Sequence, residues 1–144
     1  GYWDYPTQSD TAPGNIVGGA TNQANYNNGV YSVTQSNTLD STLNYLTDAG
    51  SFSGSAGAYD TFDQGGNVSE WNDAVIDSSR GVRGSAWYYL EDFLQSSSRG
   101  VNGPTNESSR VGFRVASVPE PSTYALVLMV GAGWLLWRRR KVNL

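Results

Sequence analysis

The 144-residue sequence contains no cysteine and no histidine. Without these residues the chain cannot form disulfides, Ser-His-Asp or Cys-His nucleophile systems, or zinc sites of the usual kind. The three-histidine iron sites of some oxygenases are excluded for the same reason. Carboxylates without histidine or cysteine instead suit hard cations such as Ca²⁺.

Basic residues are scarce over most of the chain. Up to Ser117 there are five arginines, no lysine and twelve carboxylates, a net charge of −7, whereas residues 138–141 form the basic block RRRK. The overall charge of −4 therefore combines an acidic body with a basic end. Because an acidic body repels phosphate backbones, we expect no nucleic-acid partner.

Long hydrophobic runs are absent until the segment VPEPSTYALVLMVGAGWLLWRRRKVNL. Fourteen uncharged residues, 124–137, would make about 21 Å of helix, which is shorter than the ~30 Å hydrocarbon core of a bilayer. Ser122 and Thr123 extend the stretch, and the arginines can snorkel, so residues 122–137 are predicted to form a short transmembrane helix. The alternative, a buried core helix, is disfavoured because RRRK would have to leave the core abruptly.

The change of composition near Ser117 predicts two parts, a small domain over residues 1–117 and a tail over residues 118–144. The basic end is expected to stay cytoplasmic and the body to lie outside. The sequence begins at Gly1 and not at Met. We therefore expect an amino-terminal portion, including any signal peptide, upstream of Gly1.

Few regular elements are predicted in the body. Residues 1–29 are rich in Asn, Gly, Gln and Thr, which favour turns and loops. A strand is predicted over residues 30–33 (VYSV), and strands are also predicted in GVRGSAW and VGFRVAS. Leu39, Leu43 and Leu46 are spaced as on one face of a helix, so a short amphipathic helix is predicted over residues 38–46.

Several short patterns have ordinary interpretations. GNIVGG lacks the Gly-Lys-Ser/Thr ending of a phosphate-binding loop. The adjacent carboxylates Glu91 and Asp92 are expected on a solvated face and not as an acid and base pair. Six aromatic residues can either stack on sugar rings or pack in the domain, and packing is favoured: Tyr2, Trp3, Tyr5, Trp87, Tyr88 and Tyr89.

The segment YDTFDQGGNVSEW is the best candidate for chemistry. Asp63 and Glu70 flank a glycine-bearing turn whose backbone carbonyls could point inward. Oxygen ligands on a tight turn are what Ca²⁺ accepts. Taken alone, a turn with two acidic residues is more often only a turn, so both interpretations stay open at this point.

The order of parts in the tail resembles the PEP-CTERM sorting signal of exported bacterial proteins. Pro119-Glu120-Pro121 is followed by an apolar stretch and then by an arginine cluster. The resemblance implies recognition by a membrane protease of the exosortase class and loss of the tail. It also implies transient residence in the inner membrane, then delivery to the cell surface or extracellular matrix of a Gram-negative bacterium.

Three motifs of the body, GNVSEW, RGVRGSAW and GFRVAS, occur in this order. They resemble the C-terminal half of the formylglycine-generating enzyme (sulfatase-modifying factor) family, whose usual forms are close to Gly-Asn-Val-Trp-Glu-Trp, Arg-Gly-Gly-Ser-Trp and Gly-Phe-Arg. The resemblance implies an α+β, C-type-lectin-like fold with low regular secondary structure and bound calcium.

The same resemblance implies two calcium sites. One would use the side chains of Asp63 and Glu70 and the carbonyls of Gly66 and Val68. The second would begin at Asn25 and the Tyr26 carbonyl, with its other ligands in the loop around Asp40.

The oxidising enzymes of the family bind copper through two cysteines. The resemblance places that pair near Tyr89 and Leu94, which are not cysteines. No residue here replaces the thiolates that Cu(I) needs, so no copper is expected. Ser69 also replaces the usual tryptophan, and Ala86 interrupts the Arg-Gly-Gly-Ser-Trp pattern.

These patterns favour an exported, non-catalytic, calcium-stabilised surface or extracellular-matrix module, with a polysaccharide or a protein as its ligand. One alternative is a sulfatase-modifying-factor-type oxidoreductase, or a related protein-modifying enzyme, whose active residues lie upstream. Another is a purely structural domain that binds only metal and itself.

Overall fold

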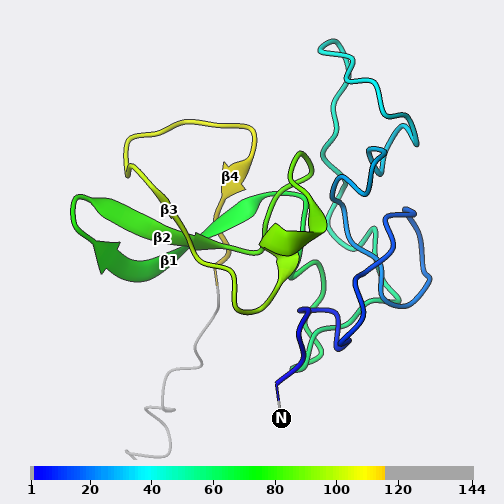
Figure 1. Cartoon of the computed structure of the whole chain (residues 1–144), viewed down its shortest axis with the longest axis horizontal. Helices are drawn as coiled ribbons and strands as arrows, with labels where there is room; N and C mark the ends of the chain where they lie inside the picture. The colour runs from blue at the N-terminus through cyan, green and yellow to red at the C-terminus, as the bar shows by residue number, and fades with distance from the viewer. Residues whose placement is uncertain (1, 116–144) are drawn as a thin grey trace, which may run out of the picture. The chain divides into compact units, whose positions relative to one another are not determined.

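The structure is a computed structural model that describes residues 2–115 (Figure 1). The chain divides into two units, residues 1–114 and residues 115–144. The regular elements are four strands and one short 3₁₀ helix: β1 (Ser69–Ile76), β2 (Ser79–Arg83), η1 (Glu91–Leu94), β3 (Gly100–Asn102) and β4 (Val111–Gly112). No α-helix occurs among residues 2–115, so the helical part of the α+β expectation is wrong for this part of the chain.

The strands form one sheet in the order β3-β2-β1-β4. The pairs β1–β2 and β2–β3 are antiparallel, whereas β1–β4 is parallel. The register of the β1–β2 hairpin shifts between Trp71 and Val75. There the Asn72 side chain accepts the Ala74 N–H at 2.9 Å and lies over Gly81, where a Cβ would be only 2.4 Å from Asn72 Oδ1. Asn72 therefore accounts for the irregularity, because its side-chain oxygen takes the place of a backbone carbonyl as the acceptor for the Ala74 N–H.

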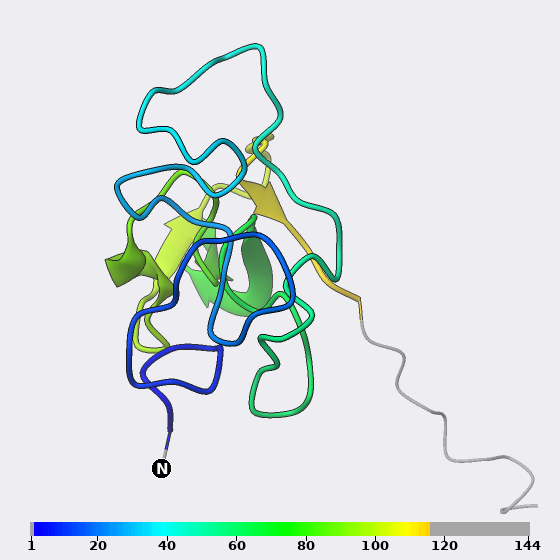
Figure 2. The ribbon, with the colours of Figure 1, turned by 90° about the vertical axis from the view of Figure 1, so that its right-hand side faces the viewer.

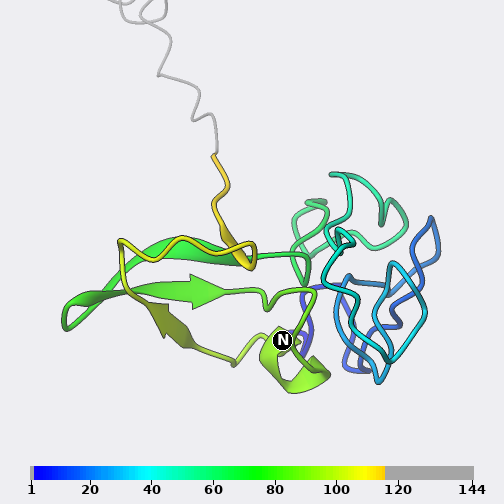
Figure 3. The ribbon, with the colours of Figure 1, turned by 90° about the horizontal axis from the view of Figure 1, so that it is seen from above.

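The sheet covers only part of the first unit. Residues 2–68 form irregular loops beside it, drawn from blue to green in Figure 1. The view from above shows the same division (Figure 3), and in the side view the loops lie in front of the strands (Figure 2). Side chains satisfy the backbone there: Asn15 Nδ2 donates to the Val30 carbonyl at 2.7 Å, and the Ser55 hydroxyl accepts the Gln23 N–H at 2.8 Å. The Asn, Gln and Ser content thus replaces secondary structure with side-chain hydrogen bonds.

The buried core joins the loops to η1. Its main cluster consists of Tyr5, Ala24, Tyr26 and Leu94, and Tyr26 is fully buried. The Tyr26 hydroxyl donates to the Pro13 carbonyl, so its polar end is satisfied. Leu94 is the last residue of η1 and closes the cluster from the side of that helix.

The helix predicted over residues 38–46 does not form. The Asp40 carboxylate accepts both the N–H and the hydroxyl of Thr42, at 2.9 and 2.6 Å, and the Asn44 side chain accepts the Leu46 N–H at 3.0 Å. These turns take the donors that a helix would use. Tyr45 is buried instead, and Leu39 and Leu43 are exposed, so the leucine spacing was misleading.

The strand predicted over residues 30–33 is also wrong, because this segment forms a turn in which Gln35 N donates to the Tyr31 carbonyl at 2.8 Å. The strands predicted within GVRGSAW and VGFRVAS are confirmed in part, by the end of β2 and by β4. Among residues 2–115 no helix is long and apolar enough to cross a membrane. The transmembrane helix predicted over residues 122–137 lies outside the described residues.

The buried Tyr26 predicts a loss of stability at alkaline pH. Burial raises the pKa of the Tyr26 phenol from 10.0 to about 12, with smaller contributions from Glu91 and Tyr5. Between these values the unfolded chain has lost a proton that the native state keeps, so the contribution is complete below pH 10 and is lost as the pH rises toward 12. The free energy of unfolding should fall by up to about 1.4 kcal/mol per pH unit in this window. Urea unfolding across the range measures this slope. Tyr26→Phe keeps the ring without the proton and should make the slope shallower, and an unchanged slope would contradict the assignment.

Candidate functional site

The sheet brings together the three motifs singled out in the sequence. β1 begins within GNVSEW, β2 ends within RGVRGSAW, and β4 begins GFRVAS with its preceding valine. In the parallel β1–β4 pair, Ser69 lies opposite Val111 and Glu70 opposite Gly112. This register carries Arg114, two residues beyond β4, to Glu70, which is 44 positions earlier in the sequence.

The four residues predicted to bind the first calcium ion lie around one pocket. This pocket, called the Asp63 pocket below, has a volume of about 220 Å³ and is lined by Ala49, Asp63, Gly66, Asn67, Val68, Glu70 and Arg114. The described residues contain no cluster of three acidic side chains. Any cation held here would therefore depend on backbone carbonyls to complete its ligands, as Ca²⁺ sites commonly do.

Asp63 is the residue of this pocket with an unpartnered buried side-chain oxygen. Its Oδ2 accepts the Gly50 N–H at 2.6 Å, but its Oδ1 is buried and has no hydrogen-bond partner. A buried carboxylate oxygen without a partner is costly, because it has lost water and gained nothing in return. A bound Ca²⁺ would satisfy it, so the donor set fits this ion, with Glu70 and the carbonyls of Gly66 and Val68 as its companions.

Arg114 already balances part of the charge in the Asp63 pocket. Its Nε and Nη2 both lie 2.6 Å from Glu70 Oε1, the only ion pair among residues 2–115. Its Nη1 donates to the Phe62 carbonyl at 2.7 Å and its Nη2 to the Asp63 carbonyl. A metal ion would thus share Glu70 with a guanidinium group. The sequence analysis quoted Gly-Phe-Arg only as a motif and did not assign this arginine to the site.

Asn67 is a second residue that the sequence analysis missed. Its Oδ1 accepts the Thr47 N–H and the Asn25 amide, at 2.9 and 3.0 Å, and its Nδ2 donates to the Thr47 carbonyl at 3.1 Å. Its backbone N–H donates to the Asn25 carbonyl at 2.7 Å, and its carbonyl accepts the Trp87 N–H at 3.1 Å. Asn67 therefore holds three distant segments around the floor of the Asp63 pocket. In the sequence, the feature that could have identified Asn67 was its position between the glycine turn and Glu70.

Asn25 and Tyr26, predicted to begin a second calcium site, are buried in the middle of the loops. The Asn25 amide donates to the Tyr45 carbonyl at 2.9 Å, and the Tyr26 carbonyl accepts Asn15 Nδ2 and the Ser32 hydroxyl, at 3.3 and 3.1 Å. These contacts are part of the hydrogen-bond framework of the fold. Near the other proposed ligands, hydrogen bonds from Thr42 lower the pKa of the exposed Asp40 carboxyl. The second site stays a prediction.

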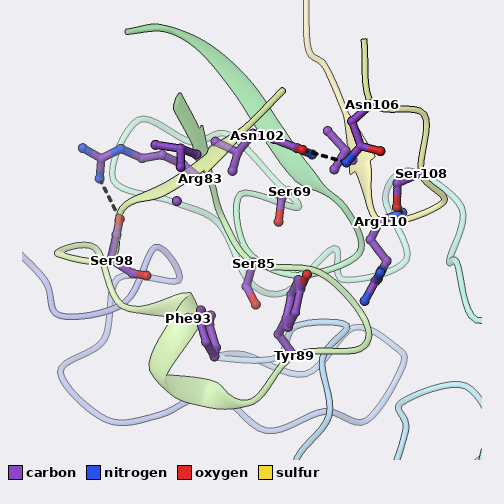
Figure 4. Close-up of a pocket in the computed structure, with 14 residues that line it drawn as sticks. Ser69, Arg83, Ser85, Tyr89, Phe93, Ser98, Asn102, Asn106, Ser108 and Arg110 are labelled. Carbon is purple, nitrogen blue, oxygen red and sulfur yellow. Dashed lines mark hydrogen bonds between the residues drawn. The ribbon is translucent and has the colours of Figure 1, made fainter. Parts of the chain in front are cut away.

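A different pocket lies at Tyr89, one of the two positions near which the family's copper-binding cysteines were expected. It has a volume of about 270 Å³, and Tyr89 and Phe93 form one of its walls (Figure 4). We call it the Ser85 pocket, because the Ser85 hydroxyl is buried there without a hydrogen-bond partner. Tyr89 packs against Phe93 with ring centroids 5.2 Å apart, whereas Leu94 is buried in the core. Both expected cysteine positions thus hold packed hydrophobic side chains.

Of the six aromatic residues singled out in the sequence, some pack against other side chains and others are exposed to solvent. Trp87 stacks on Tyr45 with ring centroids 4.9 Å apart, and Tyr5 belongs to the buried core. Tyr2 and Trp3 are 99% and 46% exposed. Packing is therefore confirmed for Tyr5 and Trp87, and the same prediction is wrong for the exposed Tyr2 and Trp3. Glu91 and Asp92 are both exposed on η1, as the solvated-face interpretation predicts.

Comparison with known families gives two matches. Residues 3–118 match the family model of the sulfatase-modifying factor enzyme 1-like domain, and residues 117–141 match that of the PEP-CTERM protein-sorting motif. No curated protein and no solved structure matches significantly. Both resemblances drawn from the sequence are confirmed by these matches.

Proposed function

Because the chain belongs to the sulfatase-modifying factor enzyme 1-like domain family, we propose that it is a non-catalytic member, exported and stabilised by calcium. The observation that carries this proposal is the lack of any cysteine or histidine in the sequence, together with what occupies the expected thiol positions. Tyr89 lines a pocket and Leu94 is 1% exposed in the core, and neither side chain offers a thiolate, which supports the proposal.

The PEP-CTERM motif marks the chain for export and for processing at the membrane in Gram-negative bacteria. We propose that residues 122–137 hold the chain in the inner membrane until an exosortase-class protease removes the tail. The body then reaches the cell surface or the extracellular matrix. There the domain serves as a binding module, with a polysaccharide or a protein as its ligand. The acidic body, at −7 up to Ser117, argues against nucleic acid in that role.

The tail is therefore expected to be absent from the mature protein. In a host that carries the sorting protease, the mature chain should end within residues 119–122 and be recovered outside the cytoplasm. Mass spectrometry of the C-terminal peptide measures where the chain ends. A variant with Arg138, Arg139 and Arg140 replaced by Gln is the matched control, and it should keep its tail. Recovery of the parent chain from the cytosol with Leu144 intact would contradict export.

Formylglycine formation is expected to be undetectable. Oxidation of a cysteine side chain by this family depends on Cu(I), and thiolates are the soft ligands that suit Cu(I). We would incubate the purified chain with copper and a cysteine-containing sulfatase peptide, then measure the peptide mass. An active family enzyme is the positive control. A peptide product with the mass of formylglycine would overturn the non-catalytic assignment and favour the enzyme alternative.

Calcium is proposed as a structural ion in the Asp63 pocket. When bound, it supplies positive charge to oxygens that the fold has removed from water. Asp63 provides the unpartnered oxygen, and the glycine turn at Gly66 brings its backbone close to the Asn25 carbonyl. The C-type-lectin-like arrangement implied by the family remains part of this proposal. A small sheet beside long irregular loops supports it.

A further inference from the structure

The interior of the Ser85 pocket is polar and built by buried hydroxyl groups. Ser69 and Ser85 are 8% and 4% exposed, and both line the pocket together with Tyr89. Their three hydroxyls gather toward its middle (Figure 4). Ser85 has a φ of 64°, a left-handed conformation that glycine adopts more easily than serine. A strained residue with a buried, unpartnered Oγ indicates a place where a ligand supplies the missing hydrogen bond.

The charge of the Ser85 pocket is opposite to that of the body. Two of the body's five arginines, Arg83 and Arg110, are among its 14 lining residues, and none of the 14 is a carboxylate. The Arg110 guanidinium lies 5.2 Å from the ring centre of Tyr88 and 5.6 Å from that of Tyr89. Among residues 2–115 it has no ion-pair partner. Aromatic rings therefore position a cation that remains available to an anion.

Size and shape narrow the ligand further. The volume of about 270 Å³ is just below the ~300–1,000 Å³ of small-molecule sites, so the pocket accepts one ring and not a long chain. The Tyr89 and Phe93 rings offer apolar surface on one side. Asn102 and Asn106, joined by a 2.7 Å hydrogen bond, offer amide groups on another. A ring with several hydroxyls and one negative charge matches all of these groups.

We propose that the Ser85 pocket binds a sugar acid, a single sugar ring that carries a carboxylate. Arg110 pairs with the carboxylate, and the hydroxyls of Ser69 and Ser85 bond to the sugar hydroxyls. Tyr89 and Phe93 contact the apolar edge of the ring. This inference rests on the proposed function, since it names a ligand class for a module taken to be non-catalytic.

The test is a titration of the 144-residue chain in detergent, with binding measured by isothermal titration calorimetry. The probes are D-glucuronate, D-glucose, which differs in having a hydroxymethyl group in place of the carboxylate, and inorganic phosphate. Glucuronate should bind saturably and at least about 10-fold more tightly than glucose or phosphate. Arg110→Gln should weaken glucuronate binding at least about 10-fold and leave any glucose binding unchanged.

Two further variants separate binding from folding. Ser85→Gly suits the backbone conformation at this position, so it should fold at least as well as the parent while binding glucuronate several-fold more weakly. Arg80→Gln, an exposed arginine on the same strand as Arg83 but outside the pocket, is the matched control and should bind as the parent does. Full binding by Arg110→Gln or by Ser85→Gly would place the ligand elsewhere and overturn the proposal.

The remaining outcomes are equally decisive. If glucose binds as tightly as glucuronate, the pocket does not recognise the carboxylate. If phosphate binds as tightly as glucuronate, the pocket is a general anion site. Either result overturns the proposal. So does the absence of glucuronate binding by a folded chain. The function proposed above fails separately, through formylglycine formation or an insensitivity to calcium, neither of which is measured by this titration.

Discussion

Millimolar Ca²⁺ is expected to raise the melting temperature of the chain by roughly 10–20 °C relative to EDTA. A ligand that binds only the folded state at a hundredfold excess over its Kd adds about 2.7 kcal/mol. That is a large share of the stability of a domain this small. On this proposal the ion would satisfy the buried Asp63 oxygen, which otherwise has no hydrogen-bond partner. Tryptophan fluorescence can follow the melting, since Trp87 is half-buried against Tyr45.

Asp63→Asn is the sharpest variant for this experiment. It keeps the shape of the side chain and an acceptor for the Gly50 N–H, but it removes the charge. In EDTA it should melt at or above the parent temperature, because an uncompensated buried carboxylate has gone. In Ca²⁺ the variant should lose most of the rise in melting temperature that the ion gives the parent. Asp92→Asn, at an exposed position outside the pocket, should match the parent in both buffers. If the parent melts at one temperature in both buffers, the calcium assignment is wrong.

Arg114→Gln is expected to lower the melting temperature in EDTA and to enlarge the increment that Ca²⁺ adds to it. Without metal the variant loses the ion pair to Glu70 and the hydrogen bonds to two carbonyls, so its melting temperature should fall. With metal a competing guanidinium has been removed from Glu70, so the calcium increment should grow. An increment that shrinks would show instead that Arg114 organises the site.

Gly66→Ala is expected to lower the melting temperature by roughly 15–30 °C in either buffer, a loss of about 3–5 kcal/mol. Gly66 has a φ of 76°, and a Cβ there would lie 2.2 Å from the Asn25 carbonyl oxygen. The left-handed conformation alone costs an alanine about 1–2 kcal/mol. The clash adds more, because the Asn25 carbonyl accepts the Asn67 N–H and cannot move without breaking that bond.

Gly29→Ala is the matched control for the backbone strain. Gly29 has nearly the same φ, 78°, but a Cβ there meets nothing within 4 Å. The melting temperature of Gly29→Ala should fall only by the amount that the left-handed conformation costs an alanine, a few degrees to about 15 °C. Equal losses in the two variants would show that the close approach to Asn25 contributes nothing.

Composition and local motifs were enough to determine several properties of this protein. The absence of cysteine and histidine leaves this chain without thiolate or imidazole ligands for a metal ion, whatever the fold. The order of GNVSEW, RGVRGSAW and GFRVAS identified the family, and the tail identified the sorting motif, and both were confirmed. The four residues predicted for the first calcium site lie at one pocket because they are close in sequence and share one glycine turn. Local information suffices to bring together residues that are close in the sequence.

Tertiary structure decided what depends on distant partners. The leucine spacing of residues 38–46 predicted a helix, but Tyr45 is buried there and its carbonyl accepts the Asn25 amide, 20 positions earlier in the sequence. Arg114 reaches Glu70 only because β4 pairs in parallel with β1. The two buried, unpartnered oxygens, Asp63 Oδ1 and Ser85 Oγ, could not be found from sequence. Whether an oxygen keeps water or a partner depends on which segments cover it, and chain packing alone sets that.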